Sequence, residues 1–336
     1  MTFVEKFPRK DALKMQMFSL TLSQMLMMFS LMAVGFILRK KNIVNPDAYV
    51  TLSKLETFAL VPALTFHNQL TNCTVETFTK NSPLILYGLG VILVALVVGF
   101  FLSVLFVPNH KESPELSYKR NIYKYAMSFS NYGFMGNFIV LGIWGSAMFF
   151  KYTMFTFFLA MFCSAYGLYI LIPKESGASI WANLKKGLLA PPIVALALGV
   201  ICGLLNLGQY FPTFALSALE KAGDCMGPVA MILAGMVIGG YDFKSLLLDK
   251  KVYIATFVRL IILPVVFVLA LRLIGASKEV MTLCLIAFGT PLGMNTIVYP
   301  AAYGGETKTG ASMTMISHVL SVITIPIMYL LLIELL

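Results

Sequence analysis

The sequence predicts an all-α membrane protein in which ten transmembrane helices form two five-helix halves. Three observations carry this prediction. Hydrophobic residues make up 59% of the 336 residues and charged residues only 12%, against about 25% charged residues in soluble domains. Uncharged stretches long enough to cross a bilayer recur along the chain. Two of these stretches, one in each half, are interrupted at corresponding places by glycine and asparagine.

The ten predicted helices are uncharged stretches, several of which alone reach the roughly 20 residues that one crossing requires. They cover residues 15–38, 57–75, 81–109, 125–150, 152–173, 187–219, 225–241, 260–271, 280–305 and 309–333. The first follows basic residues, but it is too long for the apolar part of a signal peptide and lacks a small-residue cleavage site. We therefore expect it to be retained, after a short polar tail of residues 1–14.

Lysine and arginine are distributed unevenly among the predicted loops. The loops after helices 1, 3, 5, 7 and 9 contain 14 of them, the loops after helices 2, 4, 6 and 8 contain four, and the N-terminal tail contains four more. Because cytoplasmic loops carry the excess of positive charge, both termini are expected outside the cell, with the protein in the plasma membrane. The formal net charge of +10 then reflects the basic residues of the cytoplasmic loops and does not indicate nucleic-acid binding.

A weak internal repeat has an offset of 166 residues, which carries Pro62 onto Pro228. Each half then contains an odd number of helices, so the second half is inverted relative to the first. This is the arrangement of transporters that alternate access about a central site. We predict a first repeat at 15–173, a short cytoplasmic linker at 174–186 and a second repeat at 187–336.

The two interruptions read Asn-Tyr-Gly-Phe-Met-Gly-Asn at 131–137 and Gly-Thr-Pro-Leu-Gly-Met-Asn at 289–295. Unpaired backbone groups at membrane depth are tolerated only where they line a protein cavity, so these segments predict broken helices at a substrate site. A helix that begins inside the membrane offers free N–H groups and a dipole that favour a carboxylate, and asparagine adds amide donors. The candidate substrate-binding residues are Asn131, Gly133, Gly136, Asn137, Thr290, Pro291, Gly293 and Asn295.

Ionisable residues inside apolar spans are further candidates. Arg259 is expected either to bind the substrate carboxylate or to extend toward the basic end of its helix. Asp224 is a candidate for proton or cation coupling, with pairing to Lys221 or a position at a wet interface as the alternatives. Glu56 is expected at a solvated helix end, and the lone His318 is expected to be satisfied by a hydrogen bond.

Glycine and proline make two further predictions about the helices. Gly199 with Gly203, and Gly235 with Gly239, have the Gly-x-x-x-Gly spacing of closely packed membrane helices. Membrane helices tolerate proline kinks, but Pro228 follows several glycines and predicts a break near the cavity.

The sequence lacks the residue groups that an enzyme or an ATP-driven pump would need. It contains no Walker motif, and no acidic pair, serine–histidine pair or metal cluster falls within the spans. The five cysteines stand singly, without metal-binding spacing. We therefore predict that the protein is not an enzyme and uses no cofactor and no metal. A membrane receptor, the other class considered, would need an output domain from a partner chain.

Three stretches together resemble the auxin efflux carrier family: the 131–137 element, the stretch from Pro291 to Gly305, and the last helix with its Thr324-Ile325-Pro326. The family includes plant auxin exporters and bacterial permeases for malate and related organic anions. The resemblance implies a scaffold domain of helices 1, 2, 6 and 7, a transport domain of helices 3–5 and 8–10 in which helices 4 and 9 cross, and a homodimer. Family members usually have a proline where this chain has Phe138, so the first crossing is expected to be less sharply kinked.

These observations predict an efflux carrier, secondary-active or driven by the membrane potential, for a small organic anion such as malate or an auxin-like carboxylate. It would work in the lipid bilayer by elevator or rocking alternating access. An exported anion can use an inside-negative potential, worth about 2.3 kcal/mol per charge per 100 mV, so ion coupling is optional. The alternative is a sodium-coupled organic-anion symporter of the bile-acid carrier type.

Overall fold

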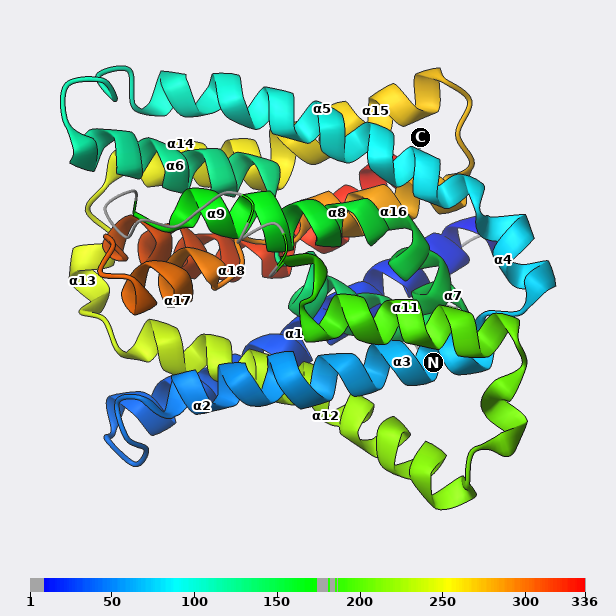
Figure 1. The fold of residues 1–336 in the computed structure, drawn as a ribbon. Coiled ribbons are helices and arrows are strands. Elements are labelled where there is room, and N and C mark those ends of the chain that lie inside the picture. Colours follow the sequence, from blue (N-terminus) through cyan, green and yellow to red (C-terminus); the bar gives the residue numbers. More distant parts are fainter. Residues whose placement is uncertain (1–8, 174–180, 182–184, 186, 336) are drawn as a thin grey trace.

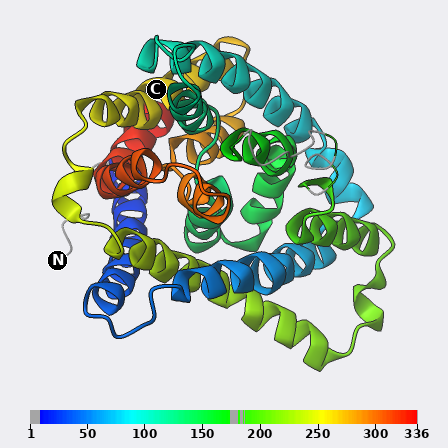
Figure 2. The same ribbon diagram turned by 60° about the vertical axis from the view of Figure 1, so that its left-hand side comes forward.

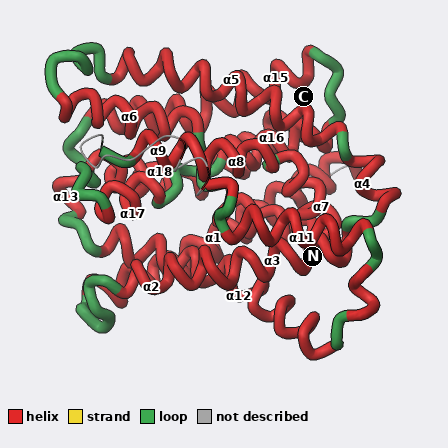
Figure 3. The backbone as a smooth tube through the Cα atoms, viewed as in Figure 1, coloured by secondary structure: helices red, strands yellow, loops and turns green. Residues whose placement is uncertain are grey.

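The computed structural model describes residues 9–173, 181, 185 and 187–335. These residues form helices joined by short loops, and none of them lies in a strand (Figures 1 and 3). Six described segments are long and apolar enough to cross a membrane: Lys14–Lys40, Val75–Phe106, Pro114–Phe155, Thr213–Gly239, Lys250–Leu273 and Lys308–Leu335. The prediction of an all-helical protein with several membrane-crossing helices is therefore confirmed. Residues 1–8 of the predicted tail and most of the predicted linker at 174–186 lie outside the described residues.

The helices follow one another in chain order, with short π-helical or 3-10 segments (η) between some of them. In the first half they are α1 (Arg9–Lys40), α2 (Ala48–Leu55), η2 (Glu56–Leu60), α3 (Val61–Asn72), α4 (Val75–Asn81), α5 (Pro83–Phe106), α6 (Pro114–Ser128), η3 (Tyr132–Gly136), α7 (Asn137–Phe155), α8 (Phe157–Phe162), η4 (Cys163–Gly167) and α9 (Leu168–Leu171). In the second half they are α11 (Pro191–Leu204), η6 (Leu207–Tyr210), α12 (Thr213–Gly239), α13 (Phe243–Leu246), α14 (Lys250–Phe257), η7 (Val258–Ile262), α15 (Leu263–Leu273), α16 (Lys278–Gly289), α17 (Asn295–Ala302), α18 (Lys308–Tyr329) and η8 (Leu330–Leu335).

Glycines allow two helix pairs to approach closely. A Cβ atom at Gly235 of α12 would overlap the backbone carbonyl of Met32 on α1, so the two backbones touch there. Gly199 and Gly203 of α11 lie in the same way against Gln69 of α3. Small residues at such contacts let membrane helices pack by van der Waals attraction. The predicted role of both Gly-x-x-x-Gly pairs in packing is confirmed.

The predicted break at Pro228 is wrong, because α12 continues through it from Thr213 to Gly239. A proline in a membrane helix removes one backbone hydrogen bond, which the surrounding protein can tolerate. The neighbouring Gly227 instead makes room for a helix contact, since a Cβ atom there would overlap the ring of Phe138.

The apolar segment from Pro114 to Phe155 is not one helix. α6 ends at Ser128 and η3 begins at Tyr132, so the helix is broken without the family's proline. Further on, Gly145 inside α7 has φ 75° and ψ −172°, a conformation that glycine adopts without the penalty of a side chain. The chain therefore breaks at 129–131, at the start of the first predicted interruption, whose residues 132–137 are helical, and it turns again at Gly145.

The breaks lie inside the protein. Seen along the helices, α17 (orange) lies in the middle of the bundle, with α1 to α3 (blue) and α12 (yellow-green) along one side and α5 (teal) along another (Figure 2). Asn131 at the first break is 3% exposed and Thr290 at the second is 0% exposed. Irregular backbone at membrane depth requires this shielding from lipid.

Candidate substrate-binding site

The two breaks, at 129–131 and 290–294, lie against each other and are hydrogen-bonded across a contact that we call the crossing. At the first break, Phe129 is extended and the N–H of Asn131 donates to the carbonyl of Pro291 at 2.8 Å. The hydroxyl of Ser130 donates to the carbonyl of Ala287, in the last turn of α16. These bonds satisfy backbone groups that neither helix can satisfy alone, which is why the chain can remain unwound here.

The second break is also held by α18. α16 ends at Gly289, Thr290 is extended, and α17 begins at Asn295. The N–H of Leu292, between the two half-helices, donates to the hydroxyl of Ser317 on α18 at 3.1 Å. Both predicted interruptions therefore form one crossing that joins three helical regions.

A cavity of about 190 Å³ opens beside the crossing. It lies between the two breaks, the α8–η4–α9 region, and the helices η2–α3 and α11. Its lining residues are Thr57, Val61, Thr65, Ser130, Asn131, Tyr132, Gly133, Phe134, Asn137, Thr153, Thr156, Phe157, Ala160, Cys163, Ser164, Leu168, Ala190, Pro192, Ile193, Leu196, Gly293, Met294, Asn295 and Tyr299. None of these described residues carries a formal charge.

Five of the residues that the sequence singled out line this cavity: Asn131, Gly133, Asn137, Gly293 and Asn295. Three others, Gly136, Thr290 and Pro291, belong to the crossing but not to the cavity wall. Position 136 requires a glycine because a Cβ atom there would overlap the hydroxyl of Tyr152. That hydroxyl donates to the carbonyl of Tyr132 at 3.1 Å and so supports the first turn of η3.

Both half-helices that follow the breaks begin at the cavity. Tyr132, Gly133 and Phe134 form the first turn of η3, and Gly293, Met294 and Asn295 lead into α17; all six line the cavity. The first N–H groups of a helix have no acceptor within the helix. Each such end also carries roughly half a positive charge from the helix dipole. Two partial positive ends therefore converge on one uncharged space.

The side-chain amide of Asn131 is oriented by a histidine. Nδ1 of His318 lies 2.7 Å from the carbonyl of Thr314, which can only accept, so Nδ1 carries the ring proton. Nε2 is then the acceptor for the Nδ2 group of Asn131, 3.3 Å away. The predicted hydrogen bond of the lone His318 is confirmed, and the carbonyl oxygen of Asn131 is left for the cavity.

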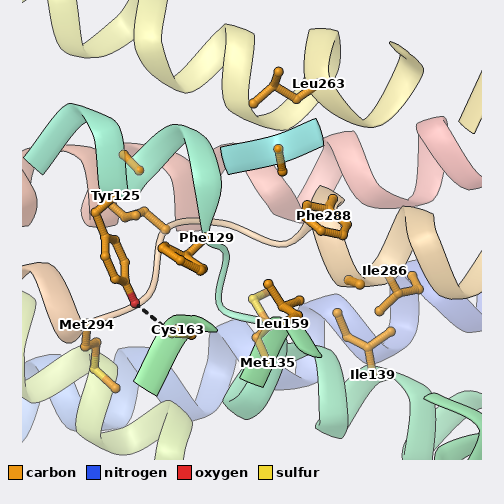
Figure 4. Packing of buried hydrophobic residues seen from close by; sticks show 14 of the residues in the cluster. Tyr125, Phe129, Met135, Ile139, Leu159, Cys163, Leu263, Ile286, Phe288 and Met294 are labelled. Atoms are coloured by element: carbon orange, nitrogen blue, oxygen red, sulfur yellow. Dashed lines mark hydrogen bonds between the residues drawn. The ribbon is translucent and has the colours of Figure 1, made fainter. Parts of the chain in front are cut away.

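Asn295 is held in the corresponding way at the other break. Its Nδ2 group donates to the hydroxyl of Tyr125 at 2.9 Å and approaches the sulfur of Cys163 at 3.9 Å. The Tyr125 hydroxyl and Cys163 sulfur are themselves 3.2 Å apart, and a dashed line marks this hydrogen bond in Figure 4. Asn295 therefore also presents its carbonyl oxygen. Asn137 makes no side-chain hydrogen bond to any described group, so its amide N–H groups stay available.

Arg259 lies behind the crossing and does not line the cavity. Its side chain is 1% exposed, and its guanidinium donates to the carbonyl of Phe288 at 2.8 Å and to the carbonyl of Thr290 at 3.4 Å. Both carbonyls belong to the C-terminal end of α16, where the helix dipole is negative. In this structure Arg259 therefore caps the half-helix that precedes the second break.

Two acidic residues lie differently from what the sequence suggested. Asp224 is exposed and 3.3 Å from the amine of Lys221, the pairing that was one alternative to ion coupling. Glu56, expected at a solvated helix end, is 0% exposed, so that expectation is wrong. The reason is that η2 packs along α12, and no local pattern in the sequence reveals which side of this helix is covered.

Comparison with known proteins shows the family of the chain. A family model described as "Membrane transport protein" matches residues 20–329. The uncharacterized transporter YfdV of Escherichia coli K12 is 23% identical over 169 residues, which is 48% of this chain and 51% of YfdV. The YfdV proteins of Escherichia coli O157:H7 and Shigella flexneri match to the same extent, so the chain spans about half the length of these curated relatives. Because the family model covers nearly the whole chain, the protein belongs to the membrane transport protein family, the family of the auxin efflux carriers.

Proposed function

We propose that the protein is a carrier that moves a small organic anion across the membrane and binds it in the cavity at the crossing. One observation carries the proposal: the N-terminal ends of two half-helices, each with free N–H groups, converge on a single uncharged cavity. Together the two ends supply about one positive charge. A full charge on a side chain in the membrane would be costly, and the described lining contains none.

The size of the cavity supports a small substrate. Its 190 Å³ is close to the roughly 150 Å³ of a protein cavity that binds benzene and below the roughly 300–1,000 Å³ of pockets for drug-sized ligands. A single small carboxylic acid fits this range. The aromatic wall residues Tyr132, Phe134, Phe157 and Tyr299 would contact an apolar part of the substrate.

The polar groups of the cavity support a more specific substrate class. The backbone N–H groups and Asn137 can donate to a carboxylate, whereas Asn131 and Asn295 present acceptors because their amide nitrogens are engaged elsewhere. The substrate that satisfies both kinds of group carries a carboxylate and a hydrogen-bond donor. Hydroxy acids such as malate and indole acids such as auxin both have this combination.

The proposed architecture has ten spans in two inverted halves, with the termini outside the plasma membrane. Adding 166 to the bounds Ala48 and Asn72 of the α2–α3 region gives 214 and 238, within one residue of α12, and adding it to those of α5 gives 249 and 272, within one residue of α14–α15. Ion pairs support the sidedness, since each joins ends assigned to the same side of the membrane. They are Lys151–Glu279 at 2.5 Å, Lys278–Glu334 at 2.8 Å and Lys119–Asp249 at 3.5 Å.

The position of the cavity supports alternating access. One wall belongs to the crossing and the α8–α9 region, and the other to η2–α3 and α11. A displacement of the first group against the second would carry the site from one membrane face to the other. Dimerisation through η2–α3 and α11, as the family resemblance implies, would keep these helices fixed while the first group moves.

The test is counterflow of radiolabelled malate into proteoliposomes, compared between wild type, Asn137→Asp and the exposed-loop control Asn109→Asp. A carboxylate about 4 Å from the substrate anion costs about 4 kcal/mol at an effective dielectric constant of about 20. We therefore expect Asn137→Asp to lower exchange at least tenfold and Asn109→Asp to leave it unchanged.

Each arm of the experiment has a defined meaning. Undiminished exchange by Asn137→Asp would refute the placement of the site in this cavity. Exchange that requires sodium in the medium would favour the symporter alternative. If wild type exchanges neither malate nor a labelled indole acid, the proposed substrate class is refuted.

A further inference from the structure

Glu56 is a carboxylic acid enclosed in the protein without a partner. Its side chain is 0% exposed, and neither carboxyl oxygen has a hydrogen-bond partner among the described groups. It begins η2, a π-helical turn inserted between α2 and α3; such turns are rare and occur frequently at functional sites. An ionised carboxylate is not stable in such a place without compensation, so this conformation holds Glu56 protonated.

Among the residues that the structure describes, the surroundings of Glu56 contain no charge that could pair with it. It shares a buried helix face with Leu60 and Leu64, and Leu64 packs on Gly223 of α12. α2–α3 and α12 run antiparallel (Figure 1), so the α12 residues beside Glu56 lie beyond Gly227, where the helix is apolar to its end.

Titratable groups on the helices around Glu56 lie elsewhere. On α12 they are Glu220, Lys221, Asp224 and Cys225, on α11 Cys202, on α3 His67, and on α2 Tyr49 and Lys54. Glu220, Lys221 and Cys202 lie beyond the level of Leu64, whereas Asp224 and Cys225 follow Gly223 and lie level with residues 63 and 62, six or seven residues from Glu56 and about 9–10 Å along the helix. Lys54 is exposed and two positions away, so it does not share the face of Glu56. A bound metal ion would need several oxygen ligands, and the described residues offer no such cluster.

Glu56 lies next to the cavity and close to the contact between Phe138 and α12. Thr57, the following residue, lines the cavity together with Val61 and Thr65 on the adjoining helix face. On the other side, the ring of Phe138 rests on Gly227 of α12. Counting four residues along each antiparallel helix from the Leu64–Gly223 contact places Gly227 level with Leu60, one turn from Glu56. Phe138, which follows the first break, therefore contacts α12 one turn from the level of Glu56.

We propose that Glu56 is a proton-binding site that couples a proton to the movement of the anion. This inference rests on the proposed transport function. In the conformation described here Glu56 is a neutral carboxylic acid. When the crossing moves and water reaches the carboxyl group, the O–H bond breaks, the proton passes to water and the carboxylate is hydrated. Because the carboxyl group has to be neutral whenever it is enclosed, a proton bound from the water at one membrane face is carried through the enclosed conformation and released to the water at the other face, one proton for each substrate anion.

The experiment uses proteoliposomes of the full chain with the membrane potential clamped to zero by potassium and valinomycin. Counterflow of a labelled acid reports exchange, an internal pH dye reports proton movement, and a pH difference of one unit drives accumulation. The variants are Glu56→Gln, which imitates the protonated acid, and Glu220→Gln, the control on the exposed side of α12. For one proton per anion, wild type and Glu220→Gln are expected to accumulate substrate up to about tenfold. Glu56→Gln is expected to exchange substrate without accumulation or proton movement.

Two outcomes overturn the inference while leaving the transport function intact. One is wild-type exchange that a pH difference does not drive, and the other is pH-driven accumulation by Glu56→Gln equal to wild type. Infrared spectroscopy of the purified protein at neutral pH gives a readout that needs no substrate. The carbonyl band of a protonated carboxyl group should be present in wild type and Glu220→Gln and absent in Glu56→Gln. If wild type exchanges no acid, the transport proposal fails on its own, and a missing infrared band then refutes the protonated Glu56.

Discussion

Replacement of Arg259 by methionine tests whether this residue holds the crossing together or binds the substrate. Methionine preserves much of the side-chain volume but removes the guanidinium that donates to the carbonyls of Phe288 and Thr290. These two carbonyls are buried at the end of α16, so no water replaces the lost donors. The variant therefore leaves the negative end of a half-helix uncapped inside the membrane.

The magnitude follows from the two contacts. Hydrogen bonds to a charged donor contribute about 1.5–3 kcal/mol each, and the 3.4 Å contact to Thr290 is weaker than the 2.8 Å contact to Phe288. Loss of the favourable interaction with the helix dipole adds up to about 2 kcal/mol. Removal of a buried charge returns part of this because the desolvation penalty disappears. We expect Arg259→Met to lower the free energy of unfolding by about 2–4 kcal/mol and Arg259→Lys, which keeps a charge and one donor group within reach, to lose less.

The assay is thermal unfolding in detergent with a dye that fluoresces on reaction with thiols. Cys73, Cys163 and Cys284 are buried and react only after unfolding, whereas the exposed Cys225 sets the baseline. The KM for substrate exchange is measured in parallel. A structural cap predicts a lower melting temperature and little change in KM. An unchanged melting temperature together with a strongly raised KM would refute this reasoning and make Arg259 a substrate ligand.

Three further predictions concern packing, amide orientation and space. Gly235→Ala should lower the free energy of unfolding by about 1–3 kcal/mol, because the added methyl group overpacks against Met32. Gly90→Ala, where a Cβ atom meets nothing within 4 Å, should leave the free energy of unfolding unchanged. The melting temperatures of the two variants and the wild type test this. His318→Phe removes the acceptor for the amide of Asn131. It should therefore change the ratio of the KM values for malate and for its deoxy analogue succinate. An unchanged ratio would contradict the proposed orientation of the Asn131 amide. Gly293→Val should fold, because a Cβ atom there makes only ordinary contacts at 3.6–3.8 Å, but should reduce exchange by filling the cavity, which counterflow measures.

The sequence could predict the helix breaks of the site, because unwound backbone is not tolerated where it would face lipid. Glycine and asparagine in an uncharged span stand out because a break in the membrane needs protein around it. The second break lies where the residues placed it, and the first lies at 129–131, at the start of the predicted segment. The Gly-x-x-x-Gly pairs stand out for a similar reason, since a close approach of two backbones leaves no room for a side chain.

The rest depends on contacts between distant segments. The partner of Asn131 is His318, 187 residues away, so the direction of its amide cannot be deduced from neighbouring residues. The burial of Glu56 depends on which face of η2 meets α12. Pro228 was expected to break its helix, yet the surrounding packing kept the helix whole. Local residue preferences have little influence where tertiary packing decides the outcome.

The three bonds that connect the crossing bear on the direction of transport. Asn131 to Pro291, Ser130 to Ala287 and Leu292 to Ser317 tie both broken helices to α18. Anything that displaces one of these segments carries the other two, so the groups that hold the substrate keep their mutual geometry while their surroundings change. In the proposed cycle the substrate would meet the same binding groups from either face of the membrane. The protein would then have no built-in preference for uptake or release, and the gradients of substrate, protons and voltage would choose between them.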